Sequence, residues 1–293
     1  MIFLQLLVNG LIAGAIYALV SSGFSLIYST CKFVHFAHGV SIAFAAYFTY
    51  LFFSILQINF YIASLLAILF AVVLGFLMNL IIYKQLRKKK SSSVILLIAS
   101  VGLLILLESL ILLFFGADVK TIGYIQVAKG MEIFGAIITP LQVWIIFISL
   151  VLFVLIFLFM KKTRMGKAIR AVADNKDVAE IVGISSEKIY LWSFLVGSAI
   201  AGIAGVLIGL EQNLSPTMGI ELMIKGFTAA IIGGIGSIPG AILGAFLLGL
   251  VENFGIWFLP SGYKDAIAFF ILLIFLLFKP NGILGIRKQE DKE

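Results

Sequence analysis

Eight long apolar runs are the feature that most constrains the fold of this chain. They cover about residues 2–28, 36–56, 60–83, 93–115, 141–160, 190–210, 226–258 and 265–278. Each run is continuous, whereas the strands of a membrane barrel alternate apolar and polar residues over segments of about 10 residues. Because about 20 apolar residues form one helical crossing of a bilayer, the runs predict an all-α polytopic membrane bundle with about eight membrane segments.

The composition excludes several classes of protein. Apolar and aromatic residues make up 62% of the 293 positions and charged residues 12%, against about 45–50% and about 25% in an ordinary soluble domain. This excludes a soluble enzyme, a disordered chain and a nucleic-acid-binding domain. No loop is long enough for a separate catalytic domain, so residues 1–293 are expected to form one transmembrane domain. The N-terminus has no basic segment or evident cleavage site, so we expect it to be retained as the first helix.

Most of the 21 Lys and Arg residues fall into three clusters between or after the apolar runs. They are Lys84, Arg87, Lys88, Lys89 and Lys90; Lys161, Lys162, Arg164, Lys167, Arg170, Lys176 and Lys188; and Lys279, Arg287, Lys288 and Lys292. The positive-inside rule places all three clusters, and therefore the C-terminus, in the cytoplasm. Binding of nucleic acid or lipid headgroups by these clusters is the alternative.

The run at 226–258 is expected to be a re-entrant segment. It is longer than one crossing needs, and Gly233-Gly234-Ile235-Gly236-Ser237-Ile238-Pro239-Gly240 interrupts it with helix-poor Gly and Pro. We therefore predict a half-helix from the outside to mid-membrane, a turn and a helix back out. With this arrangement the last run crosses inward and leaves the basic tail in the cytoplasm.

A second interruption, at residues 29–39, separates the first two runs. Non-helical backbone at membrane depth must be buried in protein or line a wet cavity, and broken helices of transporters gather near the substrate path. Both interruptions therefore predict solute transport, although the depth of the first one stays open. The candidate path residues are His35, Phe36, His38, Gly39, Gly233, Gly234, Gly236, Ser237 and Gly240.

Small residues recur at every fourth position in three of the runs. These rows are Gly10, Gly14, Ala18 and Ser22; Gly197, Ala201, Gly205 and Gly209; and Gly240 and Gly244. Such rows allow helices to approach closely, so they predict a tightly packed bundle rather than a substrate site.

The sequence predicts no catalytic residue, metal site or cofactor on this chain. It contains no Walker A motif for ATP. The glycines at 234, 236 and 240 resemble a dinucleotide fingerprint only in part, and they lie inside an apolar run. His35 and His38 share a helix face if their segment is helical, but two histidines are too few ligands for a metal site.

Glu108 stands alone inside the fourth apolar run. An intramembrane carboxylate is a functional hypothesis by default, so Glu108 is a candidate proton site of a secondary transporter. Alternatively, it is neutral, or hydrogen-bonded to serine or backbone within the bundle. The second interpretation is favoured because no second buried acid accompanies it.

The basic loop at about 161–190 has the pattern of two short helices. Asp174 is the expected N-cap of the second helix, with Asp177 three residues later, and Gly183 can adopt the left-handed conformation that ends it. The alanines at 168, 171 and 179 keep the loop slim. A helix-turn-helix that projects from a membrane bundle favours docking into the groove of a partner, although packing of the loop on itself is the alternative.

Four motifs of this chain resemble those of the branched-chain amino-acid ABC permease family, in order and spacing over nearly the whole chain. They are Asn9-Gly10-Leu11-x-x-Gly14-x-x-Tyr17-Ala18-Leu19; Phe36-Ala37-His38-Gly39; Gly166-x-x-x-Arg170-Ala171-x-x-x-Asn175-x-x-x-Ala179-x-x-x-Gly183-Ile184; and Phe227 to Ala241, with Gly233-Gly234-Ile235-Gly236 at its centre. The short N-terminus is similar to the smaller, LivH-like subunit. The family usually has Asn at His35, an acidic residue at Val40 and Ala at Gly226, which leaves the solute open.

The resemblance implies the permease subunit of an importer for leucine, isoleucine and valine in the bacterial inner membrane. The implied partners are a second, related permease in a heterodimer, two cytosolic ATPases that hold ATP and Mg²⁺, a periplasmic or lipid-anchored binding protein, and membrane lipid; nucleic acid is not a partner. The expected mechanism is alternating access. The residues implied to couple the permease to the ATPases are Gly166, Arg170, Ala171, Asp174, Ala179 and Gly183, with Arg170 as the polar anchor and the two glycines setting backbone shape.

Three alternatives remain at this point. Related permeases for urea or short amides share these motifs. A proton-coupled secondary transporter would rely on Glu108, and a passive channel would need no energy source. The coupling loop favours an ABC permease over the last two, because an autonomous transporter has no need of such a loop.

Overall fold

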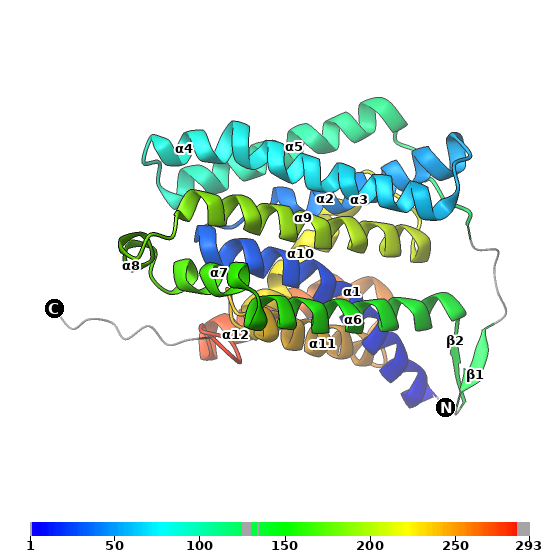
Figure 1. Ribbon diagram of the computed structural model, residues 1–293. Helices are drawn as coiled ribbons and strands as arrows, with labels where there is room; N and C mark the ends of the chain where they lie inside the picture. Colours follow the sequence, from blue (N-terminus) through cyan, green and yellow to red (C-terminus); the bar gives the residue numbers. More distant parts are fainter. Residues whose placement is uncertain (1, 125–129, 134, 286–293) are drawn as a thin grey trace.

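The computed structural model describes residues 2–124, 130–133 and 135–285. These residues form a bundle of helices with a small antiparallel hairpin at one end (Figure 1). The helices are α1 (Ile2–Cys31), α2 (Ala37–Tyr50), α3 (Phe60–Leu77), α4 (Lys84–Lys88), α5 (Ser93–Phe115), α6 (Pro140–Lys162), α7 (Arg164–Asp174), α8 (Lys176–Ile181), α9 (Ser186–Glu211), α10 (Met218–Gly233), α11 (Ile238–Gly255) and α12 (Lys264–Phe278). The hairpin pairs β1 (Met131–Ile133) with β2 (Ala136–Ile138).

Among the described residues, eight helical segments are long and apolar enough to cross a membrane, which confirms the predicted polytopic bundle. Two of them extend through π-helical turns: α2 continues through Leu51–Ile55, and α3 reaches α4 through Met78–Tyr83. Helix α10 has 16 residues, fewer than the 18 residues of the shortest of these segments. Seven of the predicted runs coincide with one such segment each, with ends shifted by a few residues, whereas the run at 226–258 is divided between α10 and α11.

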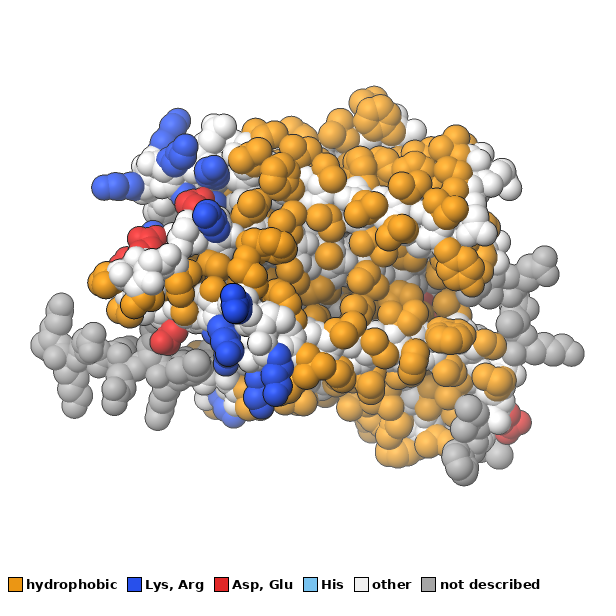
Figure 2. Space-filling model, in the orientation of Figure 1, with side chains coloured by type: hydrophobic (Ala, Val, Ile, Leu, Met, Phe, Trp, Pro, Cys, Tyr) orange, Lys and Arg blue, Asp and Glu red, His pale blue; other side chains and the backbone are white. Residues whose placement is uncertain are grey.

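Charged side chains gather at one end of the bundle, which we call the basic end. It carries the described members of the three basic clusters, from the α4 region, the α6–α9 connection and the end of α12. Figure 2 shows Lys and Arg side chains at this end and a broad hydrophobic surface over the middle of the molecule. Arg287, Lys288 and Lys292, which the sequence also assigned to the third cluster, lie outside the described residues.

Helix α1 runs through the centre of the bundle and packs against α9, α10 and α11 (Figure 1). Its glycines are the contact points: a Cβ on Gly14 would lie 2.8 Å from the Cα of Phe246, and one on Gly10 would lie 3.0 Å from the Cα of Leu250. Gly205 of α9 likewise faces the backbone of Ile42. The small-residue rows therefore serve close helix packing, as the sequence predicted.

Replacement of Gly244 by alanine tests this packing. A Cβ at Gly244 would meet the carbonyl oxygen of Ala229 and the backbone of Gly233, so α10 and α11 would have to separate. We expect a loss of about 1–3 kcal/mol of stability, seen as a lower midpoint of thermal unfolding in detergent. Gly102→Ala is the matched control, because a Cβ there meets nothing within 4 Å. Equal midpoints for the two variants would contradict the packing argument.

The interrupted run at 226–258 forms a deeper hairpin than the sequence predicted. Helix α10 already begins at Met218, and the turn after Gly233 lies against the segment that follows α12, where the amides of Ile283 and Leu284 donate to the carbonyls of Ile232 and Gly233 at 2.9 and 2.8 Å. The prediction of a mid-membrane turn is thus wrong: the turn lies towards the basic end. The reason is length, since helices of 16 and 18 residues span about 24 and 27 Å, close to a bilayer core of about 30 Å.

The first interruption comprises residues 32–36, where Lys32 adopts a positive φ of 53°. It also lies towards the basic end, because His35 bonds to Tyr83, the residue that directly precedes Lys84. The depth of this break, which the sequence left open, is therefore nearer to one end of the bundle than to its middle.

Candidate transport and coupling sites

Helices α7 and α8 form the predicted elbow between α6 and α9, and each is capped by a side chain. The Thr163 hydroxyl accepts from the amide of Gly166 at 2.9 Å at the start of α7. At the start of α8, the Asn175 side chain accepts from the amides of Asp177 and Val178 at 3.0 and 3.1 Å. The predicted cap, Asp174, is instead the last residue of α7. Asn175 takes the role because it has the extended backbone that a cap requires.

The elbow has one packed side and one exposed apolar side. Ile169, Val172 and Ala179 are buried against the bundle. On α8 and just after it, Val178, Ile181 and Val182 are 55%, 84% and 68% exposed. Gly183 then turns the chain with a φ of +87°. Packing of the loop against the protein itself therefore accounts for the apolar residues of α7. Helix α8, in contrast, leaves an apolar surface that nothing in the described chain covers.

The close packing of α7 on α6 requires a glycine at position 166. A Cβ there would meet the carbonyl oxygen of Phe159 and the backbone of Met160, so only glycine lets α7 fold back onto the end of α6. Ala171 is half-buried on the same helix. Gly166 thus allows α7 to pack closely against a membrane helix, and its role in coupling stays a prediction.

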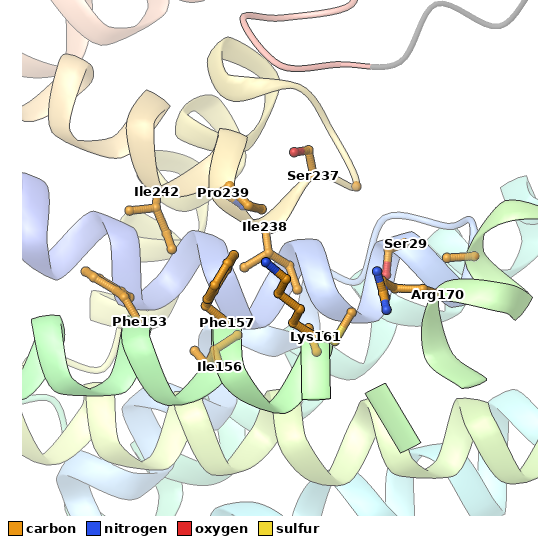
Figure 3. A pocket seen from close by; sticks show the side chains of 13 residues that line it. Ser29, Phe153, Ile156, Phe157, Lys161, Arg170, Ser237, Ile238, Pro239 and Ile242 are labelled. Carbon is orange, nitrogen blue, oxygen red and sulfur yellow. The ribbon is translucent and has the colours of Figure 1, made fainter. Parts of the chain in front are cut away.

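A cavity of about 480 Å³ lies between the elbow and the turn that joins α10 to α11. Its walls come from α6, α7, α11 and the end of α1, and they include Arg170, Gly236, Ser237 and Ser29. Figure 3 shows Arg170 and Lys161 among the largely apolar side chains of Phe153, Phe157 and Ile242. One predicted coupling residue and two predicted path residues therefore meet at a single cavity.

The other candidate path residues are packed, and none of them lines either of the cavities described here. Gly233 and Gly240 face each other's backbone, and Gly234, with a φ of +111°, lies against Gly285. Gly39 faces Gly219 and Met223, at the start of α10. These glycines are close-packing positions in the conformation seen here. Their role in a translocation path stays a prediction.

His35 and His38 belong to a buried aromatic and polar cluster. The Tyr83 hydroxyl and His35 Nδ1 are 2.9 Å apart, and the Ser100 hydroxyl lies 3.3 Å from the same nitrogen. His38 is fully buried against Gly23, and Phe36, half-buried, stacks obliquely on Phe227. Within the described part of the chain, no third metal-binding side chain joins the two histidines. The cluster ties the first break to the π-helical turn Met78–Tyr83, to α5 and, through the contact of His35 with Phe194, to α9.

The predicted isolated carboxylate and the actual buried carboxylate are different residues. Glu108 is half-buried on α5 and, among the described residues, has no ion pair or hydrogen-bond partner. Glu252, inside α11, is fully buried. The expectation that no second buried acid exists is therefore wrong, because an acid inside an apolar run can be paired by a side chain of another helix.

Glu252 anchors an ionic network that joins four helices at the end opposite the basic end. Lys225 Nζ of α10 lies 2.5 Å from Glu252 Oε1 and 2.7 Å from Asp265 Oδ1 of α12. The hydroxyl of Tyr17, from α1, donates to Glu252 Oε2 at 2.8 Å. The Lys225 side chain is 10% exposed, whereas that of Asp265 is 74% exposed. The network thus runs from a dry core to the surface.

A second cavity, of about 230 Å³, opens beside this network. Glu221, Lys225, Lys264 and Asp265 line it together with apolar residues such as Leu222 and Phe269. These charges were not predicted from the sequence to form a site. The available signal was the presence of Lys225 and Glu252 next to or inside apolar segments, where ionisable residues are rare and functional by default.

Comparison with known proteins identifies the family of this chain. Residues 6–276 match the family described as "Branched-chain amino acid transport system / permease component". The chain belongs to this permease family. The match covers all of the long helices except the first residues of α1 and the last residues of α12.

Two relatives match the permease over nearly its full length. The high-affinity branched-chain amino acid transport system permease protein BraD of Pseudomonas aeruginosa is 33% identical over 305 residues, with 99% of this chain and 98% of that protein covered. The corresponding protein LivH of Escherichia coli K12 is 32% identical over 303 residues, with coverage of 99% and 97%. The autoinducer 2 import system permease protein LsrC of Yersinia enterocolitica matches 46% of the chain at 32% identity.

A solved structure shares the fold. PsaBC from Streptococcus pneumoniae in complex with Fab superposes with a TM-score of 0.51 and 15% sequence identity. The match covers 93% of this chain and 91% of that chain. At this identity the likeness concerns the arrangement of the helices alone.

Proposed function

We propose that this permease is a membrane subunit of an ATP-driven importer of branched-chain amino acids. The observation that carries the proposal is the end-to-end match to BraD and LivH, named as permeases of high-affinity branched-chain amino acid transport systems. The elbow of α7 and α8 supports it, because it presents an exposed apolar surface to a partner. The solute would be leucine, isoleucine or valine.

The partners follow from the same proposal. A related permease would complete the membrane channel, two ATPases would bind ATP and Mg²⁺ at the basic end, and a solute-binding protein would deliver the amino acid at the opposite end. The positive-inside rule then sets the basic end, with the C-terminus, in the cytoplasm. The membrane is the bacterial inner membrane.

The coupling path runs from α8 through α7 to the turn between α10 and α11. Val178, Ile181 and Val182 would sit in a groove of the ATPase, in the manner of an amphipathic helix that docks by its apolar face. Because Gly166 holds α7 tightly on α6, movement of α8 would be transmitted to the cavity where Arg170 faces the turn. Opening and closing of that cavity would give alternating access.

The alternatives differ in what they require of the chain. Urea or short amides would need no charged groups along the path, whereas the permease places two members of an ionic network, Lys225 and Asp265, on the wall of a cavity. A proton-coupled transporter centred on Glu108 finds no support in its half-exposed position or in the family to which the chain belongs. A passive channel would not need the elbow.

Competition for uptake tests the solute. We expect excess isoleucine or valine to reduce leucine uptake by the assembled system at least about tenfold, because they share the charged groups and differ only in aliphatic shape. Excess urea or acetamide should leave leucine uptake unchanged. Cells that lack their own leucine transport and express the permease with its partner genes are the assay. Uptake of labelled urea in place of leucine would overturn the proposed solute class.

Reversal of the charge at Arg170 tests the coupling path. Because Arg170 lines the cavity with Lys161, Arg170→Glu would attract Lys161 and hold α7 against α6. We expect uptake to fall at least about tenfold while the ATPases still co-purify with the permease. Arg170→Lys keeps the charge and serves as the control. Normal uptake in Arg170→Glu would rule out a coupling role for this residue.

A further inference from the structure

We infer that the cavity beside Lys225 is a binding site for the zwitterionic head of the transported amino acid on the side where the solute arrives. The inference rests on the proposed function and adds to it a site on the permease itself. It starts from position: α9 ends, α10 begins and α12 begins around this cavity, all at the end opposite the basic end. A solute delivered at that end would meet this cavity before the packed breaks.

The charges of the cavity match a free amino acid. Two ammonium groups, of Lys225 and Lys264, and two carboxylates, of Glu221 and Asp265, face the same space. A free amino acid carries one ammonium and one carboxylate at neutral pH, so it can bind groups of both signs at once. Leu222 and Phe269 supply an apolar wall for an aliphatic side chain.

Lys225 can change partners without leaving Glu252. Its ammonium has three donors, and the structure uses them toward Glu252 at 2.5 Å and Asp265 at 2.7 Å. Glu252 is fully buried and also bonded to Tyr17, so this pair is fixed. Asp265 is mostly exposed, and exchange of an exposed ion-pair partner costs little. The solute carboxylate would replace Asp265 at Lys225, and the solute ammonium would bind the freed Asp265.

The volume sets the size of the occupant. The cavity measures about 230 Å³, less than the roughly 300–1,000 Å³ of pockets for drug-sized ligands. It is therefore suited to one small solute. Because its charges are already partly paired in the structure, binding must displace Asp265, and we expect the weak affinity that a transport intermediate needs.

Cysteine protection tests the site directly. Cys31 is the single cysteine of the chain and is buried, so Gln212→Cys, at an exposed and uncharged position of the cavity lining, would be the reactive thiol. The permease is assembled with its partner permease and ATPases, without the binding protein, and labelling of this chain by a membrane-impermeant thiol reagent is followed by mass. At a leucine concentration about four times its Kd, occupancy of one site slows labelling about fivefold.

Two analogues and two control variants define the outcome. We expect isocaproate, which lacks the ammonium, and 3-methylbutylamine, which lacks the carboxylate, to give no protection at the same concentration. Asp118→Cys, in the exposed loop after α5, should show no protection by leucine. The double variant Lys225→Met/Glu252→Gln in the Gln212→Cys background should lose protection by leucine, since a neutral pair replaces the ionic one.

The results separate this inference from the proposed function. Equal protection by all three compounds, or protection at Asp118→Cys, would overturn the zwitterion site. Absence of leucine protection in a complex that retains ATP-dependent leucine uptake would also overturn it and leave the proposed function standing. Absence of leucine uptake by the wild-type system would overturn the proposed function, whatever the labelling shows.

Discussion

Ile181→Asp is expected to abolish both ATPase co-purification and solute uptake. Ile181 is the most exposed apolar residue of the elbow, at 84%, and a carboxylate there would have to be desolvated in an apolar groove. Loss of a central anchor costs an interface about 2 kcal/mol or more, or about 30-fold in Kd. The measurement is the amount of ATPase retained on the affinity-tagged permease.

Two variants control for this prediction. Gln85→Asp adds the same charge at an exposed position in α4, also at the basic end, and should retain the ATPases. Ile181→Leu keeps the apolar surface and should retain them as well. Full ATPase retention by Ile181→Asp would show that α8 is not the docking element.

Lys225→Met is expected to destabilise the permease more than any other single change at the network. It leaves the buried Glu252 carboxylate with Tyr17 as its remaining partner, and an ion pair broken inside a protein costs about 3–5 kcal/mol. The midpoint of thermal unfolding in detergent measures the effect. The double variant Lys225→Met/Glu252→Gln removes both charges and should recover most of the lost stability.

The ion pair between Lys225 and the exposed Asp265 provides the comparison for this loss of stability. Asp265→Asn breaks an ion pair whose carboxylate is 74% exposed, so the loss should stay within about 1 kcal/mol. A double-mutant cycle between Lys225 and Glu252 isolates their coupling. If Lys225→Met were no more damaging than Asp265→Asn, the network would not be the electrostatic centre that its burial indicates.

Helix identity was predictable because the bilayer demands long apolar segments. The run at 93–115 coincides with α5, and the glycine rows mark the places where α1 meets α11 and where α2 meets α9. The start of α10 was missed because Glu221 and Lys225 resemble a loop when read in sequence. In the fold, Lys225 is matched by charges on α11 and α12, which no local pattern reveals.

The sites were predictable only where their signal is local. The elbow was recognised from its own residues, with the cap displaced by one position from Asp174 to Asn175. The meeting of Arg170 with Gly236 and Ser237 depends on the hairpin reaching the basic end. Glu252 was missed because a single acid does not change the overall apolar character of its run. Glu108 was singled out instead, although it is half-exposed and has no partner in the described structure.

Uptake of radiolabelled leucine into proteoliposomes tests the central claim most directly. The purified permease, with its partner permease and ATPases, is reconstituted with ATP trapped inside and with the binding protein and leucine outside. The account predicts accumulation that requires hydrolysable ATP and is lost in Ile181→Asp. Accumulation driven by an imposed proton gradient without ATP, and unchanged when the ATPases are omitted, would contradict it.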